Sequence, residues 1–492
     1  MIDVGLIPVA GEGLRLYPYS KVICKTLFEI DGKSFLQRNL EIMRDKLGVK
    51  KVYIIIGHLG GMIKNRFGDG SGLGLDLEYI ECRNVREGLA NGIYLAKDYI
   101  KSKFVVILGD EFYLDSNHEE LNKFLTTDFN AVCGVKITGD KTIIKKNYAL
   151  AIENGLVAAL QEKPTVVNNN FAGCGTYLFT PLVFDYIEKT LPSPMTGRVE
   201  LSDVINNIAQ KESRVYPFFL KGEYTNINTF DDYNAAIYLY RAAKLKDYKV
   251  SLIIPAYNEE ASIGFVIDEF KDMVDEVLVV ENCSEDKTAQ IAKEKGARVI
   301  SKKLGGYGDA LKHGMDNAIG DILILTEADA SFKARDLSKI LEYLKDADMV
   351  IGTRTTRQMI EQGANMDAFL RWGNVFAAKI VELLWWNKEP RFTDLGCTYR
   401  GIWRDAFLTI RDNLTCKGPE FSPEMMVEIL RANKKIIEIP VTYRARIGGI
   451  SKHSSSKINI LKTGFKMMKL VLRKRFNLFW MKNKQVNKKN DN

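Results

Sequence analysis

The sequence predicts an α/β protein with two tandem domains, each built on a mainly parallel central sheet, and a basic amphipathic helix at the end. In the first half, short apolar runs alternate with stretches of helical spacing. The pattern then restarts at "KVSLIIPAYNEE". We therefore expect domains at residues 1–246 and 247–456, and a basic helix with a disordered tail, from Asn483 on, at residues 457–492.

Hydrophobic periodicity predicts the elements of the first half in chain order. The apolar runs typical of buried strands are Val4–Val9, Val52–Ile56 and Phe104–Leu108. The stretches with helical spacing are Phe35–Leu47, Gly92–Ile100 and Asp231–Lys246. In the second half, "EVLVVENCSEDKT" and "DILILTEADASF" repeat the theme of an apolar strand that runs into a polar loop.

Composition indicates an intracellular protein. The seven cysteines are scattered and form no CxxC pair, which favours free thiols in a reducing compartment. No apolar run approaches the 18 residues of a spanning helix, and the first residues resemble a strand more than a signal peptide. We expect a cytoplasmic protein, with peripheral attachment to the inner membrane face as the alternative.

The net charge of +8 is concentrated at the C-terminus. From Lys457 on there are eleven Lys and Arg and one acid, whereas the rest of the chain carries 59 basic and 61 acidic side chains. The body of the protein is therefore not expected to bind nucleic acid, and an anionic partner is expected to dock at the tail.

A glycine-rich loop follows the first predicted strand in "IPVAGEGLRLYPYSKVICK". Gly11 and Gly13 would let backbone N–H groups approach a phosphate, and Arg15 and Lys25 supply nearby cations. A later strand ends in "LGDE", which brings Asp110 to the same sheet edge, where a carboxylate suits Mg²⁺ or Mn²⁺. The alternatives are a structural turn for the glycines and a helix cap for the acid.

"PVAGEGLRLYPYSKVICKTLFEI" resembles the signature of the sugar-1-phosphate nucleotidylyltransferases, with a spacing similar to bacterial UTP–glucose-1-phosphate uridylyltransferases. "EGLANGIYLAK", "VVILGDE", "LQEKP", "GTYLFTP" and "GRVELSDVI" follow in the family's order over about residues 1–240. The resemblance implies a Rossmann-like domain that makes an NDP-sugar from an NTP and a sugar-1-phosphate.

The same resemblance implies roles for individual residues. Ala10, Gly11, Gly13, Arg15 and Lys25 would hold the nucleotide phosphates. The other residues with implied roles are Gly88 beside the base, Asp110 on the metal, and Glu162, Lys163, Gly175 and Glu200 on the sugar phosphate. The sugar phosphate would attack the α-phosphorus and expel pyrophosphate, and an ionised phosphate needs no general base.

Three positions depart from the family pattern: Leu14, Cys24 and Asn226. Asn226 stands where the family often carries a second metal-ligating Asp, and an amide is a weaker ligand than a carboxylate. Two alternatives therefore stay open. The domain could bind nucleotide without turnover as a regulatory or assembly module, or it could activate a non-sugar phosphate with CTP.

Carboxylates follow three predicted strands of the second half. They are Glu259, Glu281 with Asp286, and Glu327 with Asp329. The carboxyl ends of parallel strands share one sheet edge, and an acid-x-acid pair there can grip a divalent ion on a nucleotide diphosphate. The structural alternative is a set of turn residues that cap helices.

"SLIIPAYNEE", "VVENCSEDKT" and "ILTEADASF" resemble the family 2 glycosyltransferases of the GT-A fold, and among them the dolichyl- and polyprenyl-phosphate sugar transferases, over about residues 248–476. An inverting transfer from an NDP-sugar to a lipid phosphate or glycan follows from the resemblance. The residues with implied roles are Pro255, Tyr257, Glu259 and Glu281 on the nucleotide, Glu327 and Asp329 on the metal, Asp394 and Glu424 on the acceptor side, and Arg446, Ser451 and Lys452 on phosphates. Asp394 would be the base if the acceptor is a hydroxyl.

The tail carries an apolar stripe with helical spacing. Its members are Leu461, Phe465, Met468, Leu472, Phe476 and Phe479, while Lys and Arg lie largely off the stripe and Trp480 follows. A basic amphipathic helix of this kind suits an anionic membrane surface. The alternative is a helix that packs on its own domain or on a second copy of the chain, and the oligomeric state stays open.

Overall fold

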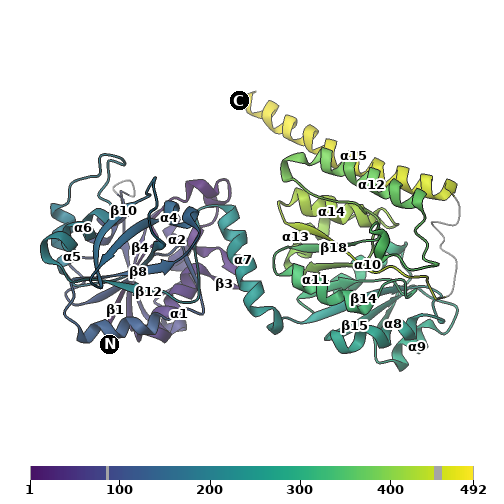
Figure 1. Cartoon of the computed structure of the whole chain (residues 1–492), viewed down its shortest axis with the longest axis horizontal. Coiled ribbons are helices and arrows are strands. Elements are labelled where there is room, and N and C mark those ends of the chain that lie inside the picture. The colour runs from purple at the N-terminus through teal and green to yellow at the C-terminus, as the bar shows by residue number, and fades with distance from the viewer. Residues whose placement is uncertain (1, 85–87, 448–456, 491–492) are drawn as a thin grey trace. The chain divides into compact units, whose positions relative to one another are not determined.

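The computed structural model describes residues 2–84, 88–447 and 457–490, and in the last helix the side chains of Ile458 and of residues 461–476. The chain divides into two compact units, Met1–Tyr240 and Arg241–Asn492 (Figure 1). Each unit has its own sheet and hydrophobic core, which confirms the predicted α/β class. The two units are described separately.

The first unit has a nine-stranded mixed sheet with a parallel centre. The parallel strands are β1 (Val4–Pro8), β4 (Lys51–Ile56), β5 (Asp76–Glu81) and β6 (Phe104–Ile107). The remaining strands are β8 (Ala131–Ile137), β9 (Tyr148–Glu153), β10 (Leu156–Glu162), β11 (Phe171–Phe179), which runs antiparallel to β6, and β12 (Val215–Phe219). A separate antiparallel pair joins β7 (Glu111–Leu114) to β13 (Glu223–Asn226).

Helices cover this sheet and bury one apolar face each. In α1 (Phe35–Leu47), which lies where the sequence predicts it, Leu36, Leu40 and Met43 are buried. Ser34 caps its first turn by accepting a hydrogen bond from the Gln37 amide, and Gly48 ends it in the left-handed conformation. The other helices are α2 (Gly60–Phe67), α3 (Leu89–Tyr94), α4 (Lys141–Lys146), α5 (Leu182–Lys189), α6 (Leu201–Glu212) and α7 (Phe230–Lys244).

The prediction of a helix at Gly92–Ile100 is wrong in its extent. The α-helix α3 ends at Tyr94, and residues 95–99 form turns. Ala96 and Ile100 are buried all the same, because the turns keep the same side of the chain toward the sheet. The helical periodicity therefore predicted correctly which side chains are buried, but it did not predict where the α-helical hydrogen bonds end.

The second unit has a seven-stranded sheet in the order β16-β15-β14-β17-β19-β18-β20. All neighbours are parallel except β19, which runs antiparallel to β17 and β18. The strands are β14 (Val250–Ala256), β15 (Glu276–Glu281), β16 (Arg298–Ser301), β17 (Ile322–Leu325), β18 (Met349–Thr353), β19 (Arg400–Trp403) and β20 (Ile436–Pro440). The helices are α8 (Ile263–Phe270), α9 (Thr288–Glu294), α10 (Tyr307–Asn317), α11 (Leu337–Leu344), α12 (Ala368–Leu384), α13 (Arg404–Ile410), α14 (Phe421–Arg431) and α15 (Lys457–Asn490).

The division between the units falls six residues before the expected boundary at 246/247, inside α7. Arg241 belongs to the second unit because its buried guanidinium pairs with Asp348 at 3.1 Å and with Asp405 at 2.9 Å. The same guanidinium lies over the ring of Trp403. A buried arginine that pairs with two carboxylates holds this end of α7 firmly in the second unit.

The final helix, α15, lies beside α12 and packs on α14 (Figure 1). It buries Leu470 and Val471, and Lys474 pairs with Glu424 and Glu428 of α14 at 2.9 Å each. Four members of the predicted stripe, Leu461, Phe465, Leu472 and Phe476, are exposed. The helix therefore packs on α14 by another face and leaves these members of the stripe uncovered.

Two further features of the tail bear on the sequence predictions. The helix continues to Asn490, whereas the polar composition from Asn483 predicts disorder. The side chains of Phe479 and Trp480 lie outside the described part of the structure. Among the described residues, no helix is both long enough and apolar enough to cross a membrane.

Candidate active sites

A cavity of about 560 Å³ lies at the edge of the first unit's sheet. The predicted residues that line it are Gly11, Gly13, Arg15, Lys25, Glu162, Lys163, Gly175, Glu200 and Asn226. The fold of residues 1–240 therefore brings most of the predicted site residues of this unit to one cavity. Ala10, Gly88 and Asp110 are not among the lining residues, although Gly88 precedes the lining Leu89 at the start of α3 and Asp110 pairs with Lys25.

The loop after β1 is open to this cavity. An added side chain at Gly11 would meet no atom within 4 Å, so the backbone there is accessible to a ligand. Gly13 adopts the left-handed conformation, with φ 62°, and Lys25 lies beside it with its Nζ 2.5 Å from Asp110 Oδ2. An accessible backbone next to two cations, here Arg15 and Lys25, can hold a polyphosphate.

Two polar side chains of the cavity wall, Glu111 and Asn226, lie near Asp110, which does not line the cavity itself. Glu111 is buried, and its Oε1 accepts a hydrogen bond from Asn226 Nδ2 at 3.0 Å. Burial, together with the negative charge of Asp110, raises the pKa of Glu111 well above its usual value. Two carboxylates and an amide are hard oxygen donors, so the residues present fit Mg²⁺ or Mn²⁺.

No group of three or more His, Cys, Asp and Glu with metal-binding geometry occurs among the described residues. The set of Asp110, Glu111 and Asn226 agrees with this finding because it has only two carboxylates. Magnesium sites of this kind are completed by water and substrate phosphates.

The opposite wall of the cavity carries Glu162, Lys163 and Glu200. The Ser202 hydroxyl donates to Glu162 Oε2 at 3.2 Å, and Lys163 Nζ lies 3.6 Å from Glu162 Oε1. Burial raises the pKa of Glu162 above its ordinary value. This wall therefore offers a hydrogen-bonding carboxyl and a cation to a polar ligand.

A larger cavity of about 1030 Å³ lies in the second unit. Its predicted lining residues are Pro255, Tyr257, Glu259, Glu327, Asp329 and Arg446. Pro255 lies in β14, and the others come from the loops after β14 and β17 and from the loop before α15. Apolar residues of α12 and α15, among them Phe369 and Phe465, line the rest of the cavity. Ser451 and Lys452 lie outside the described residues.

The acid pair after β17 faces this cavity. Glu327 Oε1 accepts from the Thr398 hydroxyl at 2.8 Å, and Asp329 Oδ2 lies 2.7 Å from Arg446. Burial and the neighbouring Asp329 raise the pKa of Glu327 to about 7. Two adjacent carboxylates with one cation suit a divalent ion bound to a diphosphate.

Glu281 and Glu424, predicted as ligand contacts, are not among the residues that line the cavity. Glu281 is buried and accepts from the Ser284 amide, so it caps the loop after β15. Glu424 is buried and accepts from the amides of Thr415 and Cys416. Burial opposes the charged form of Glu424, but Lys474 and the Cys416 amide lower its pKa below the ordinary value.

Asp394, predicted as a base, is completely buried. Its two oxygens accept from Arg354 Nε and Nη2 at 2.8 and 2.9 Å. Burial would raise the pKa of Asp394, but the Arg354 charge holds it below the ordinary value. A carboxylate committed to an arginine in this way is a poor proton acceptor.

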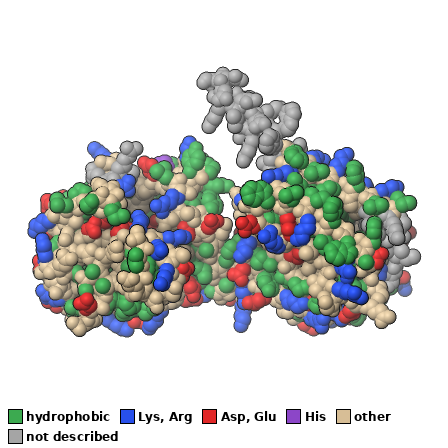
Figure 2. Space-filling model, turned by 45° about the horizontal axis from the view of Figure 1, so that its top comes forward, with side chains coloured by type: hydrophobic (Ala, Val, Ile, Leu, Met, Phe, Trp, Pro, Cys, Tyr) green, Lys and Arg blue, Asp and Glu red, His purple; other side chains and the backbone are tan. Residues whose placement is uncertain are grey.

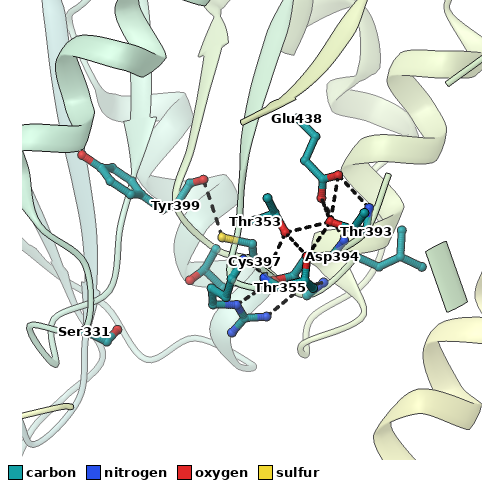
Figure 3. A network of polar contacts seen from close by, with 12 residues as sticks. Ser331, Thr353, Thr355, Thr393, Asp394, Cys397, Tyr399 and Glu438 are labelled. Carbon is teal, nitrogen blue, oxygen red and sulfur yellow. Dashed lines mark hydrogen bonds and ion pairs between the residues drawn. The ribbon is translucent and has the colours of Figure 1, made fainter. Parts of the chain in front are cut away.

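Asp394 instead holds Arg354 against the cavity. Arg354 lines the cavity directly after β18, and the sequence analysis did not single it out. Glu438 lies behind the pair and accepts from the amides of Thr393 and Asp394 at 2.6 and 2.8 Å (Figure 3). Burial and the Asp394 charge raise the pKa of Glu438 to about 7. The rule that strand ends carry functional residues would have found Arg354, because "IGTRTTR" ends a strand.

Comparison with known proteins divides the chain in the same way. The nucleotidyl transferase family model matches residues 4–243, and the glycosyl transferase family 2 model matches residues 251–407. The low-salt glycan biosynthesis nucleotidyltransferase Agl11 of Haloferax volcanii is 32% identical over 208 residues, which are 42% of this chain and 57% of that protein.

Two transferases are also similar. The low-salt glycan biosynthesis hexosyltransferase Agl6 of Haloferax volcanii is 30% identical over 206 residues, 40% of this chain and 48% of that protein. The undecaprenyl-phosphate mannosyltransferase of Micrococcus luteus is 30% identical over 230 residues, 42% of this chain and 88% of that protein. The chain thus spans about half the length of Agl11 and Agl6 and most of the mannosyltransferase. The chain therefore belongs to two families, with a nucleotidyl transferase domain at residues 4–243 and a family 2 glycosyl transferase domain at residues 251–407.

Proposed function

We propose that the chain is a bifunctional enzyme. Its first domain makes an NDP-sugar from an NTP and a sugar-1-phosphate with release of pyrophosphate, and its second domain transfers a sugar from an NDP-sugar to a lipid phosphate or glycan. The observation that carries the proposal is the presence of two cavities in one chain, each with cations and paired carboxylates at a sheet edge.

In the first domain, catalysis consists of positioning and charge neutralisation. The open backbone at Gly11 and the cations Arg15 and Lys25 hold the triphosphate. Glu162 and Lys163 orient the sugar phosphate on the opposite wall. Because this phosphate is already ionised, its oxygen attacks the α-phosphorus without a base. Asp110 would hold a divalent ion, which would supply further charge neutralisation at the phosphates.

In the second domain, the nucleotide of the donor lies along Pro255, Tyr257 and Glu259. Glu327 and Asp329 would hold a divalent ion, which would supply charge neutralisation for the departing diphosphate. Arg354 and Arg446 face the same cavity and attract a phosphate acceptor. A phosphate acceptor again needs no base, and attack from the side opposite the leaving group inverts the sugar carbon.

The two activities in one chain would act in series. A covalent link keeps the producer of the NDP-sugar near its consumer and so raises the local concentration of the intermediate. The undecaprenyl-phosphate acceptor in the name of the Micrococcus protein favours a polyprenyl phosphate over a glycan for this chain.

A screen for pyrophosphate release tests the first activity. The whole chain is incubated with each pair of NTP and sugar-1-phosphate, with Mg²⁺ and with Mn²⁺, and we expect release with one pair above all others. Binding of a nucleotide without release from any pair would favour the regulatory module. Release with CTP and a non-sugar phosphate would favour that alternative substrate class.

The transferase domain exposes an apolar surface, which we call the α12–α15 surface. Its members on α12 and just after it are Phe369, Trp372, Phe376, Leu383 and Trp386, and on α15 Leu461, Phe465, Leu472 and Phe476, all exposed. Lys462, Lys466, Lys469 and Arg473 of α15 are also exposed. Figure 2 shows hydrophobic and basic side chains interspersed on the second unit.

We propose that the α12–α15 surface docks on an anionic lipid bilayer at the inner membrane face. Aromatic side chains among basic ones match the interface of such a bilayer in both polarity and charge. Four members of the surface, Phe369, Phe376, Leu461 and Phe465, also line the cavity. A lipid-linked acceptor could therefore enter the cavity from the bilayer.

Vesicle binding tests this surface. We expect the double variant Trp372→Ser/Phe476→Ser to bind phosphatidylglycerol–phosphatidylcholine vesicles at least about tenfold more weakly, because it loses two large apolar contacts that do not line the cavity. Sedimentation with vesicles measures the binding. Point variants are preferable to deletion of the tail, because deletion would also remove Lys474 from two buried carboxylates.

Ile319→Ser is the matched control. Ile319 is also exposed, but it precedes β17 and so lies at the sheet edge opposite the cavity. Unchanged vesicle binding by the double variant would contradict the proposal. Loss of a dimer on ultracentrifugation would show instead that a second copy of the chain covers the surface.

A further inference from the structure

A buried carboxylate on the wall of the first cavity has no role in the mechanism above. Glu111 begins β7, lines the cavity and is only 1% exposed. Its Oε1 accepts one hydrogen bond, from Asn226; burial raises the pKa of Glu111 and the neighbouring Tyr224 hydroxyl lowers it, but no described residue donates a hydrogen bond of normal geometry to Oε2 of Glu111. A buried carboxylate oxygen without a partner is costly, which indicates that a ligand completes its surroundings.

The fold holds Glu111 in place from several sides. Asn39 of α1 donates to the backbone carbonyls of Leu108 and Glu111, at 3.1 Å each. On β11, a side chain at Gly175 would come within 2.5 Å of Glu111 Oε1, so only glycine leaves room for the carboxylate. The surrounding residues therefore fix the position of Glu111, and this position explains why residue 175 has to be a glycine.

Asn226 is the partner of Glu111 across a two-stranded ladder. The two residues are directly opposite in the antiparallel pair of β7 and β13. Asn226 turns its Nδ2 toward Glu111, while its Oδ1 accepts from Asn228 Nδ2 at 2.8 Å. The amide oxygen therefore already accepts one hydrogen bond, which favours a positioning role for Asn226 over the role of metal ligand that the sequence analysis expected.

We propose that Glu111, together with Asp110, supplies the carboxylates of the divalent cation site in the first domain, and that Asn226 is a positioning residue that orients Glu111. This inference rests on the proposed nucleotidyl transfer. The negative charge that Asn226 lacks at its own position is supplied from the facing strand. Carboxylate oxygens are the ligands that Mg²⁺ and Mn²⁺ prefer, and Glu111 Oε2 is available to one.

Binding of Mn²⁺ alone, followed by electron paramagnetic resonance of the free ion, tests the site without any turnover. The whole chain is used with Asp329→Asn in the background, so that the cation site proposed for the second domain is weakened. Against this background, we expect Glu111→Gln to lower the Mn²⁺ affinity by about 10–100-fold, and Asp110→Asn to do the same. Thermal unfolding confirms that each variant is folded.

A second substitution separates a ligand from a merely structural residue. In Glu111→Gln/Asn226→Asp the carboxylate moves to the facing strand, and we expect the Mn²⁺ affinity to recover. Unchanged affinity in Glu111→Gln would overturn the proposal. Loss of affinity in Asn226→Ala with full affinity in Glu111→Gln would also overturn it and would make Asn226 the ligand.

The outcome for this site is distinguishable from that for the proposed function. Mn²⁺ binding that depends on Glu111, without pyrophosphate release from any substrate pair, would uphold the site and end the proposed synthesis. Pyrophosphate release together with Glu111-independent Mn²⁺ binding would uphold the proposed synthesis and overturn the proposed site.

Discussion

Replacement of Asp329 by Asn is expected to lower sugar transfer by at least about 100-fold and to leave pyrophosphate release unchanged. Asp329 faces the second cavity beside Glu327, and its carboxylate pairs with Arg446. Without this charge the site would hold its divalent ion more weakly, and the departing diphosphate would lose stabilisation. Transfer is measured from a labelled NDP-sugar to a polyprenyl phosphate, and pyrophosphate release is measured on the same preparation.

Asp346→Asn is the control for this experiment, because Asp346 is an exposed carboxylate after α11 that does not line the cavity. Asn at position 329 keeps the shape of the side chain, so an unfolded variant is not expected. Joint loss of both activities in a folded protein would contradict independent sites. Full transfer by the variant would remove Asp329 from the mechanism.

The reciprocal experiment replaces Lys25 by Met. We expect pyrophosphate release to fall by about 100–1000-fold, while transfer from a supplied NDP-sugar stays unchanged. Lys25 is the most buried cation beside the glycine loop, with a side chain 15% exposed, and a cation shielded from water neutralises phosphate charge effectively. Methionine keeps the aliphatic length and removes only the charge.

Lys33→Met is the matched control, since Lys33 is an exposed lysine that pairs with Glu41 and does not line the cavity. Thermal unfolding of both variants detects any loss of stability. Release at the wild-type rate in Lys25→Met would show that Arg15 and the backbone suffice for the phosphates.

Most of the fold could be predicted because its signals are local. The strand at Val4–Pro8 and the helix at Phe35–Leu47 follow from apolar periodicity and from caps at Ser34 and Gly48. The face by which α15 packs could not be predicted, because a helix in a protein can bury either of two faces. The choice depended on Glu424 and Glu428 of α14, which bind Lys474 and are distant in sequence.

The candidate sites were predictable to the extent that strand ends meet at one edge. That rule located Lys25, Glu327 and Asp329 at cavities, but it could not tell a carboxylate that faces a ligand from one that faces the interior. Asp394 became structural because Arg354, 40 residues away, occupies both its oxygens. Such pairings are long-range and have no signature in a single sequence.

The ion pairs at the two ends of the second unit set the smallest piece of chain that could be moved into another protein. Arg241 neutralises the buried Asp348, and Lys474 neutralises the buried Glu424 and Glu428. A transplanted segment limited to residues 251–407, the extent of the family match, would keep Asp348 without Arg241 and would lack α14 and α15 with the ion pairs between them. A self-sufficient transferase therefore runs from about Arg241 to beyond Lys474, and engineers who recombine such domains should cut outside these two residues.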